Sequence, residues 1–293
     1  MDDKTALNYS IHELIVQNPW FSVHPLEWTS RHLEPLRCKF QIIDAPPETE
    51  TPVHREETVE EVARLATSHR DKYVSFLDLM LNKSCPFKVI HYGLSLQYGR
   101  RRLYPVECDI FVPKTAESMK ANTAIAPLVG AFLHYDRVTE AREYRFGQDA
   151  ERDADDPVQR KKDRKFRLCT PKSWYQDPYL VFHMLSLAQW QSFYVESARY
   201  PVCLLVCKTD DEDDAHVYHT IIPENIIEQL YAPTSRFEVT WPVVYQTKIP
   251  FKPYGTFFDR LTKHLKLGDI SQADEADGKT VESKFTLDTA AMA

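Results

Sequence analysis

A mostly apolar segment, LVFHMLSLAQWQSFYV, follows the dipeptide Asp177-Pro178. Aspartate is favoured as the N-cap of a helix and proline as its first residue, so this pair predicts where a helix begins. Few polar residues interrupt the segment, and the helix therefore has no face that prefers water. Such a helix must be covered by other elements, which requires a layered domain with a sizeable core.

Strand-like and helix-like patterns alternate along most of the 293 residues. Short apolar runs bounded by turn residues predict strands at 39–43, 87–97, 103–112, 201–208, 216–222 and 239–248. Helical spacing of apolar residues predicts helices at 58–82, at 115–146 with an interruption at Pro127, at 177–195, after Pro223 and at 256–267. The alternation predicts an α/β fold in which helices flank an open mixed sheet of Rossmann-like kind.

We expect a single α/β domain over residues 37–267. Residues 1–36 have no clear periodicity and predict an irregular N-terminal arm, packed on the domain through Trp20 and Trp28. Residues 148–167 are almost wholly charged and predict an exposed flexible loop. Beyond Gly268 the apolar periodicity stops, which predicts a disordered tail over 268–293.

The composition excludes several classes of protein. Only seven glycines occur, and neither GxGxxG nor GxxxxGK[ST] is present, so the dinucleotide and P-loop fingerprints are absent. No apolar run reaches the ~20 residues that a bilayer crossing requires, and the N-terminus lacks a leader pattern, so we expect a cytoplasmic protein with no membrane partner. The net charge of −7 argues against a generally basic nucleic-acid coat.

No metal site or cofactor is predicted. The six cysteines are scattered singly, which favours reduced thiols. His216 and His219 are three residues apart on a strand and therefore lie on opposite faces. Cys203 and Cys207 share a face but are more than about 13 Å apart.

Ser95 is the candidate nucleophile. In the segment VIHYGLS, Gly93 and Ser95 come late in an apolar strand, where glycine admits a ligand and the hydroxyl emerges near the strand end. Ligands of open α/β sheets usually bind at the carboxyl ends of strands. The alternative is a bulged strand whose serine caps a turn.

Charged and polar residues elsewhere in the sequence are further candidates for a site. Basic residues occur in the turn after this strand and in the second half of the charged loop. They are candidates to contact phosphates, and the alternative is that they are simply solvated. These residues are Arg100, Arg101, Arg102, Arg160, Lys161, Lys162, Arg164 and Lys165. Glu107 and Asp109 share one face of the following strand, where they would hold a guanidinium or a metal, or else face water. Tyr194 and Glu196 end the apolar helix and are candidates to bind an amine or move a proton, unless Glu196 is solvated beside Arg199.

VIHYGLS (89–95) resembles the histidine, glycine and serine strand motif of cyclodipeptide synthases. The segments at 174–191 and 241–261 are similar to a large group of filamentous-fungal proteins, and an arginine-using branch of the synthase activity occurs among such proteins. The resemblance implies a fold like the catalytic domain of class I aminoacyl-tRNA synthetases, Ser95 as acceptor of an aminoacyl group from tRNA, and Tyr194 and Glu196 as the amine-binding pair. The family places its glutamate four residues after the tyrosine, whereas Glu196 follows Tyr194 by two.

The resemblance therefore predicts a transferase that uses aminoacyl-tRNA, with arginyl-tRNA as the suspected partner, and forms an arginine-containing cyclic dipeptide. Glu107 and Asp109 would select the cationic side chain. Two alternatives stay open. One is a nuclease-like nucleic-acid-binding domain using Glu107, Asp109 and Lys114, although Lys114 follows Pro113 instead of lying two residues from an acid. The other is a non-catalytic interaction protein.

Overall fold

The computed structural model describes residues 7–45, 51–114, 127–147 and 157–266. Within these residues, seven strands form one sheet in the order β2-β9-β7-β6-β5-β4-β3, and two short strands pair beside it. The sheet contains β2 (Phe40–Ile43), β3 (Phe87–Tyr98), β4 (Arg101–Pro113), β5 (Val129–His134), β6 (Arg199–Cys207), β7 (Asp214–Pro223) and β9 (Val244–Pro250). The short pair is β1 (Leu7–Tyr9) with β8 (Phe237–Val239).

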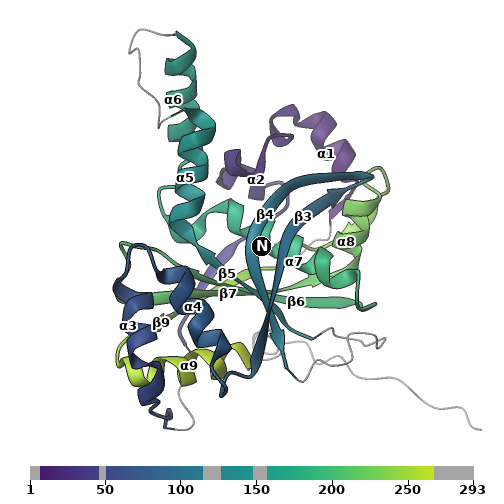
Figure 1. Cartoon of the computed structure of the whole chain (residues 1–293). Helices are drawn as coiled ribbons and strands as arrows, with labels where there is room; N and C mark the ends of the chain where they lie inside the picture. Colours follow the sequence, from purple (N-terminus) through teal and green to yellow (C-terminus); the bar gives the residue numbers. More distant parts are fainter. Residues whose placement is uncertain (1–6, 46–50, 115–126, 148–156, 267–293) are drawn as a thin grey trace, which may run out of the picture.

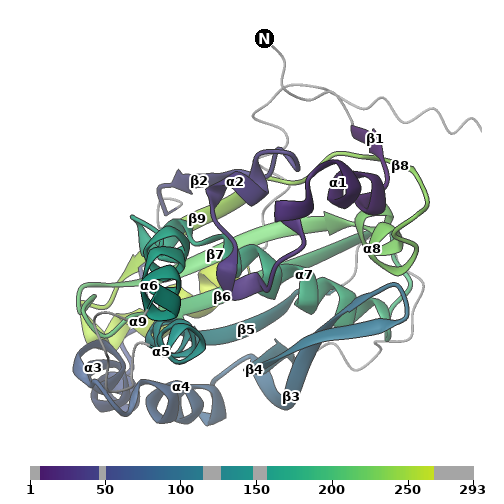
Figure 2. The same ribbon diagram turned by 90° about the horizontal axis from the view of Figure 1, so that it is seen from above.

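The sheet is mixed, because β2 runs parallel to β9 and β5 parallel to β6, whereas the other neighbours are antiparallel. Helices cover both faces and bury a separate apolar core against each (Figures 1 and 2). One face carries α7 (Pro178–Ser192), α8 (Glu224–Tyr231) and the N-terminal helices α1 (Ile11–Gln17) and α2 (Ser30–Leu33). The other carries α3 (Val59–Thr67), α4 (Lys72–Leu81) and α9 (Tyr254–Lys266). An α/β fold with a mixed sheet flanked by helices is thus confirmed.

The helix after Asp177-Pro178 is confirmed as α7. Asp177 accepts a hydrogen bond from the amide of Tyr179, and every residue from 180 to 189 is buried. The start of α7 is also held by Arg142, whose guanidinium contacts both carboxylate oxygens of Asp177 at 2.6 and 2.8 Å. The Tyr135 hydroxyl donates to the same carboxylate at 2.7 Å, and burial followed by the charge of Asp177 raises the pKa of Tyr135 well above its ordinary value. Nε of Arg142 also donates a hydrogen bond to the carbonyl of Leu26. One buried arginine therefore joins α7, α5 (Tyr135–Phe146) and the N-terminal arm.

The single helix predicted at 58–82 is wrong, because the chain turns between α3 and α4. The Ser68 hydroxyl accepts hydrogen bonds from the amides of Arg70 and Asp71, which gives the backbone an alternative to helical bonding. The buried ammonium of Lys72 then donates to the carbonyls of Leu65 and Ala66 at the end of α3. Apolar periodicity continues through the break because both helices face the same core.

The helix predicted at 115–146 is also wrong in part. Residues 129–134 form β5, which is almost wholly buried between β4 and β6, and only 135–146 are helical. A short continuous apolar run fits a buried strand and a buried helix equally well, so periodicity could not decide between them. Residues 115–126 lie outside the described part of the chain.

The flexible loop predicted at 148–167 is wrong for its basic half, which belongs to helix α6 (Pro157–Cys169). Phe166 packs against Phe146 of α5, with 6.1 Å between ring centroids, and the two helices project together from the sheet (Figure 1). Their narrow apolar contact is hidden in the sequence by the many charges. Residues 148–156 and the predicted tail at 268–293 lie outside the described residues.

The N-terminal arm is more regular than predicted, since short helical segments occupy much of 11–33. The packing of Trp20 and Trp28 on the domain core is confirmed. The strand predicted at 239–248 is divided, because β8 ends at Val239 and β9 begins at Val244.

Candidate functional site

A surface cavity of about 320 Å³ lies between the β3–β4 hairpin and the C-terminal end of α7. Three strand residues from β3, one from β4 and three residues at or just after the end of α7 line it: Gly93, Ser95, Gln97, Arg102, Trp190, Phe193 and Tyr194. The cavity therefore brings together the predicted nucleophile, the predicted tyrosine and one member of the predicted basic group. Gln97, Trp190 and Phe193 were not singled out from the sequence.

The hairpin reaches α7 because only a short part of it pairs with the neighbouring strand β5. Of β4, residues 109–111 pair with β5, and the remainder curls over the face that carries α7 (Figures 1 and 2). At the tip, Gly99 adopts a φ of 57° and its amide donates to the carbonyl of Leu230 at the end of α8. Glycine suits this turn because a side chain would be strained there. Ser95 thus lies away from the carboxyl edge of the main sheet, beside a helix end.

A bulge interrupts the hairpin directly beside Ser95. Ser95 is opposite Pro105 and Leu96 is opposite Leu103, so Tyr104 has no partner in the register. Tyr104 has a φ of 28°, which is unfavourable for a bulky residue, and its ring lies 3.8 Å from the ring of His24 in the N-terminal arm. Bulges bend a strand and redirect its side chains, so this irregularity sets how Ser95 faces the cavity. The bulge that the sequence left as the alternative explanation is present together with the cavity.

Of the two residues predicted to bind an amine, only Tyr194 is among the residues that line the cavity. Tyr194 lies just after α7, packs on Trp190 with 4.8 Å between ring centroids, and lines the cavity. Glu196 is exposed and is not among the lining residues. The chain alternates after the helix ends, because Val195 and Ser197 are buried on either side of Glu196.

The two predicted selecting acids also differ in position. Glu107 pairs in register with Gly93 of the cavity wall, and Asp109 pairs with His91, farther along the ladder. Asp109 is buried and is hydrogen-bonded to Tyr73 of α4. The burial of Tyr73, followed by this hydrogen bond, raises the pKa of Tyr73 to about 12. Asp109 is four residues from the partner of Ser95, which corresponds to roughly 13 Å along a strand. Of the two, Glu107 pairs in register with a residue of the cavity wall, whereas the Asp109 side chain is hydrogen-bonded to Tyr73 of α4.

The predicted basic residues form two separate groups. Arg102 lines the cavity, and Arg100 and Arg101 are exposed at the hairpin tip. The other group occupies α6, where all five are exposed: Arg160, Lys161, Lys162, Arg164 and Lys165. Figures 1 and 2 show α6 and the hairpin tip well apart on the face that carries α7. Within the α6 group, Lys165 lies 3.7 Å from Glu27.

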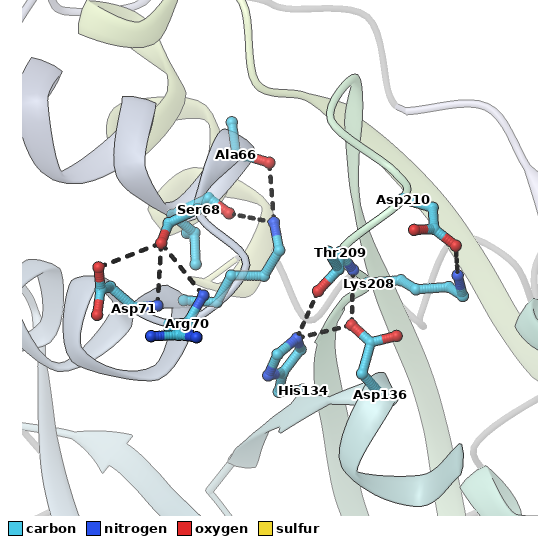
Figure 3. A network of polar contacts seen from close by, with 11 residues as sticks. Ala66, Ser68, Arg70, Asp71, His134, Asp136, Lys208, Thr209 and Asp210 are labelled. Carbon is cyan, nitrogen blue, oxygen red and sulfur yellow. Dashed lines mark hydrogen bonds and ion pairs between the residues drawn. The ribbon is translucent and has the colours of Figure 1, made fainter. Parts of the chain in front are cut away.

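A second polar cluster, which the sequence did not reveal, lies at the carboxyl ends of the parallel strands β5 and β6 (Figure 3). Nε2 of His134 lies 2.9 Å from Asp136 and 3.2 Å from the Thr209 hydroxyl, and the amide of Thr209 donates to Asp136. Burial alone would raise the pKa of Asp136, but the hydrogen bonds from His134 and Thr209 outweigh it and hold this pKa well below its ordinary value. The cluster ties the β6–β7 turn to the start of α5. The sequence feature that could have suggested this cluster is a polar residue at the end of each of the two strands.

Among the residues that the structure describes, no three histidine, cysteine, aspartate or glutamate side chains are grouped to hold a metal ion. His216 and His219 lie on opposite faces of β7, as predicted: His216 packs on Trp174 and His219 on His264. None of the six cysteines is joined to another by a disulfide. In the described ranges, none of the helices has the length and apolar character needed to span a bilayer.

The candidate site is therefore a surface cavity lined by the Ser95 hydroxyl, one guanidinium and three aromatic rings, one of which belongs to Tyr194. Its described lining includes no carboxylate. No protein-family model matches the chain, and no curated protein matches it.

Proposed function

We propose that the protein is an aminoacyl-tRNA-dependent transferase that forms a cyclic dipeptide through an aminoacyl-Ser95 intermediate. The observation that carries this proposal is that Ser95 and Tyr194, which are distant in the sequence, line one cavity. Both residues are the ones that the resemblance to cyclodipeptide synthases implies, Ser95 as the acceptor and Tyr194 as part of the amine-binding pair. The Rossmann-like relation implied by the motif is part of the same proposal and is supported by the parallel pair β5–β6, whose strands are connected through α5, α6 and α7.

In the proposed reaction, the Ser95 hydroxyl attacks the ester that joins the amino acid to the terminal ribose of tRNA. The ribose oxygen leaves with the proton, and the aminoacyl group remains on Ser95. The amine of a second aminoacyl-tRNA attacks this new ester and frees Ser95, and the resulting dipeptide closes on its own ester and releases the second tRNA. Each step exchanges one activated ester for another ester or an amide, so no nucleotide triphosphate is required.

Tyr194 and the aromatic walls have separate roles in this proposal. The Tyr194 hydroxyl binds the amine of the aminoacyl group through a hydrogen bond. Phe193 and Tyr194 are 61% and 48% exposed, so their rings have surface available on which an unpaired base can stack. Arg102 supplies a charge for the phosphate next to that base.

Arginine as the amino acid rests on Glu107 alone. A desolvated guanidinium needs a carboxylate partner, and Asp109 is committed to the α4 side of the hairpin. Glu107 pairs in register with Gly93, in the wall of the cavity. The nuclease-like alternative loses support, because Asp109 is buried and Lys114 is exposed beyond the strand.

Expression in a bacterial host, followed by mass spectrometry of the medium, tests the proposal directly. New arginine-containing diketopiperazines are the expected result. Circular dichroism and elution volume establish that the expressed protein is folded. Absence of any diketopiperazine from a folded, abundant protein would reject the transferase and favour the non-catalytic alternative.

Filling the cavity from Gly93 is expected to block product formation without unfolding the protein. A Cβ placed on Gly93 meets no atom within 4 Å, and the φ of Gly93 is not in the left-handed region. The series Gly93→Ala, Gly93→Val, Gly93→Leu should lower product formation progressively while stability is unchanged or rises by about 0.5–1 kcal/mol, because glycine weakens a strand. Product yield and urea unfolding measure the two effects. Full activity of Gly93→Leu would show that the cavity is not the substrate site.

Neutralising the basic face of α6 is expected to weaken tRNA binding and flatten its salt dependence. Each lost contact with duplex phosphate lowers the slope of log K against log salt by about 0.9. The variant replaces Arg160, Lys161, Lys162, Arg164 and Lys165 with glutamine, and a control replaces two exposed cations beside α3 and α4, Arg70 and Lys83. Filter binding across a salt series gives the slopes. Equal slopes in parent and variant would leave α6 as a solvated helix.

A further inference from the structure

Gln189 makes an unusual pair of contacts from the most buried part of α7. Its Oε1 accepts a hydrogen bond from the amide of Gln97 at 2.5 Å, and its Nε2 donates to the carbonyl of Gln97 at 2.9 Å. Gln189 is fully buried, and both bonds go to the backbone of a single hairpin residue. A planar amide that offers a donor and an acceptor pairs with an edge strand as a neighbouring strand would.

The contact between Gln189 and Gln97 lies next to residues that line the cavity. β3 is the last strand of the sheet, so its outer edge has no strand partner in the described residues. Gln97 follows Ser95 by two residues, and both line the cavity, as does Trp190, the neighbour of Gln189. The Gln189–Gln97 contact therefore joins the two walls between which Ser95 lies.

On the inner side of β3, Ser95 is next to the bulge. The register shifts between Ser95 and Leu96, and Tyr104, the residue without a partner, packs on His24. The strand is thus irregular on one side of Ser95 and held by a side-chain amide on the other. The ladder resumes beyond the bulge, from Leu96–Leu103 to Tyr98–Arg101, and the Gln189–Gln97 contact restrains this bent strand end from its outer edge.

We propose that Gln189 is a positioning residue of this site, which holds the outer edge of β3 at Gln97 and so fixes the direction in which Ser95 presents its hydroxyl to the cavity. The chemical consequence rests on the proposed function, whereas the geometric consequence does not. Gln189 touches no reacting atom and acts through the backbone of Gln97.

The helix offers a matched control. Gln191 is also a fully buried glutamine of α7, but its Nε2 donates to the carbonyl of Pro127, away from the hairpin. Gln189→Met and Gln191→Met each remove a buried amide while keeping the side-chain length. Gln189→Glu is the rescue variant, because burial favours a neutral carboxyl group, which still offers one donor and one acceptor. Gln189→Asn, shorter by one methylene, serves if Gln189→Met does not fold.

Two measurements do not depend on any reaction. Hydrogen exchange at the Gln97 amide is expected to be at least about tenfold faster in Gln189→Met than in Gln191→Met, since local opening controls exchange. Ser95→Cys then reports the serine position through its rate of alkylation, with low background because five native cysteines are buried and Cys108 is half-buried. We expect Gln189→Met to change this rate and Gln191→Met to leave it unaltered.

Product formation is the third measurement. A nucleophile displaced by about 1 Å costs about 10²-fold in rate, so Gln189→Met should lower product formation by that factor and Gln189→Glu should restore most of it. If Gln189→Met matches Gln191→Met in exchange, alkylation and product, the positioning role is excluded. If the parent makes no cyclic dipeptide, the proposed function fails, and exchange and alkylation still decide whether Gln189 fixes Ser95.

Discussion

Replacing Ser95 with alanine is expected to abolish formation of the cyclic dipeptide. The hydroxyl is the proposed acceptor of the aminoacyl group, and loss of a covalent nucleophile typically costs at least about 10³-fold in rate. The change removes one oxygen at the wall of the cavity, so the fold should be retained. Mass spectrometry of the product and trapping of a labelled aminoacyl-enzyme measure the loss.

Ser84→Ala is the control for this experiment, because Ser84 is exposed within the connection from α4 to β3 and its hydroxyl donates a hydrogen bond to the nearby Asn82 side chain. It should behave as the parent in both assays. Product made by Ser95→Ala at the parent rate would eliminate the covalent mechanism. Product formation that is lost together with the native circular dichroism spectrum would instead call for Ser95→Cys, which keeps a nucleophile at the same position.

Replacing Arg142 with alanine is expected to lower the free energy of unfolding by about 3–5 kcal/mol, the usual cost of leaving a buried charge without its partner. Asp177 has no exposed surface and would keep a carboxylate that Arg142 no longer neutralises. The same change removes the bond to Leu26 that joins the N-terminal arm to α5. Urea unfolding followed by circular dichroism gives the difference.

Arg145→Ala provides the comparison for this effect. Arg145 is on the same helix and pairs with Glu27 at 2.6 Å, but it is partly exposed, and such pairs contribute about 0–1 kcal/mol. Both variants lose one positive charge, so the difference between their free energies of unfolding measures the effect of burial. An Arg142→Ala variant no less stable than Arg145→Ala would mean that Asp177 is neutralised or hydrated by another route.

Those parts of the fold that local chemistry determines were predictable from the sequence. The start of α7 follows from Asp177 and Pro178, which act on their immediate neighbours, and β3 follows from an apolar run with clear ends. β5 was mistaken for a helix because its burial comes from β4 and β6, which are distant in the sequence. α6 was mistaken for a loop because its stability depends on contact with α5, which charge patterning does not reveal.

The candidate site shows the same division. Gly93 and Ser95 stand out locally, since a glycine and a hydroxyl late in an apolar strand are an informative combination. Gln97 and Gln189 carry no such signal, because a glutamine that pairs with backbone has the same sequence context as one that faces solvent. Glu196 is not among the residues that line the cavity, and the sequence could not show this, because the chain leaves the helix at Ser192 and helical spacing no longer applies beyond it.

The curled hairpin has a consequence for how this protein can change over evolution. The cavity lies between the hairpin and the end of α7, and most of its lining residues belong to neither apolar core. Substitutions at Gln97, Arg102 or Phe193 therefore alter the shape and charge of the cavity with little cost to folding, as is typical of sites carried on a rigid scaffold. A chain built in this way can acquire new substrate preferences one residue at a time while its sheet stays unchanged.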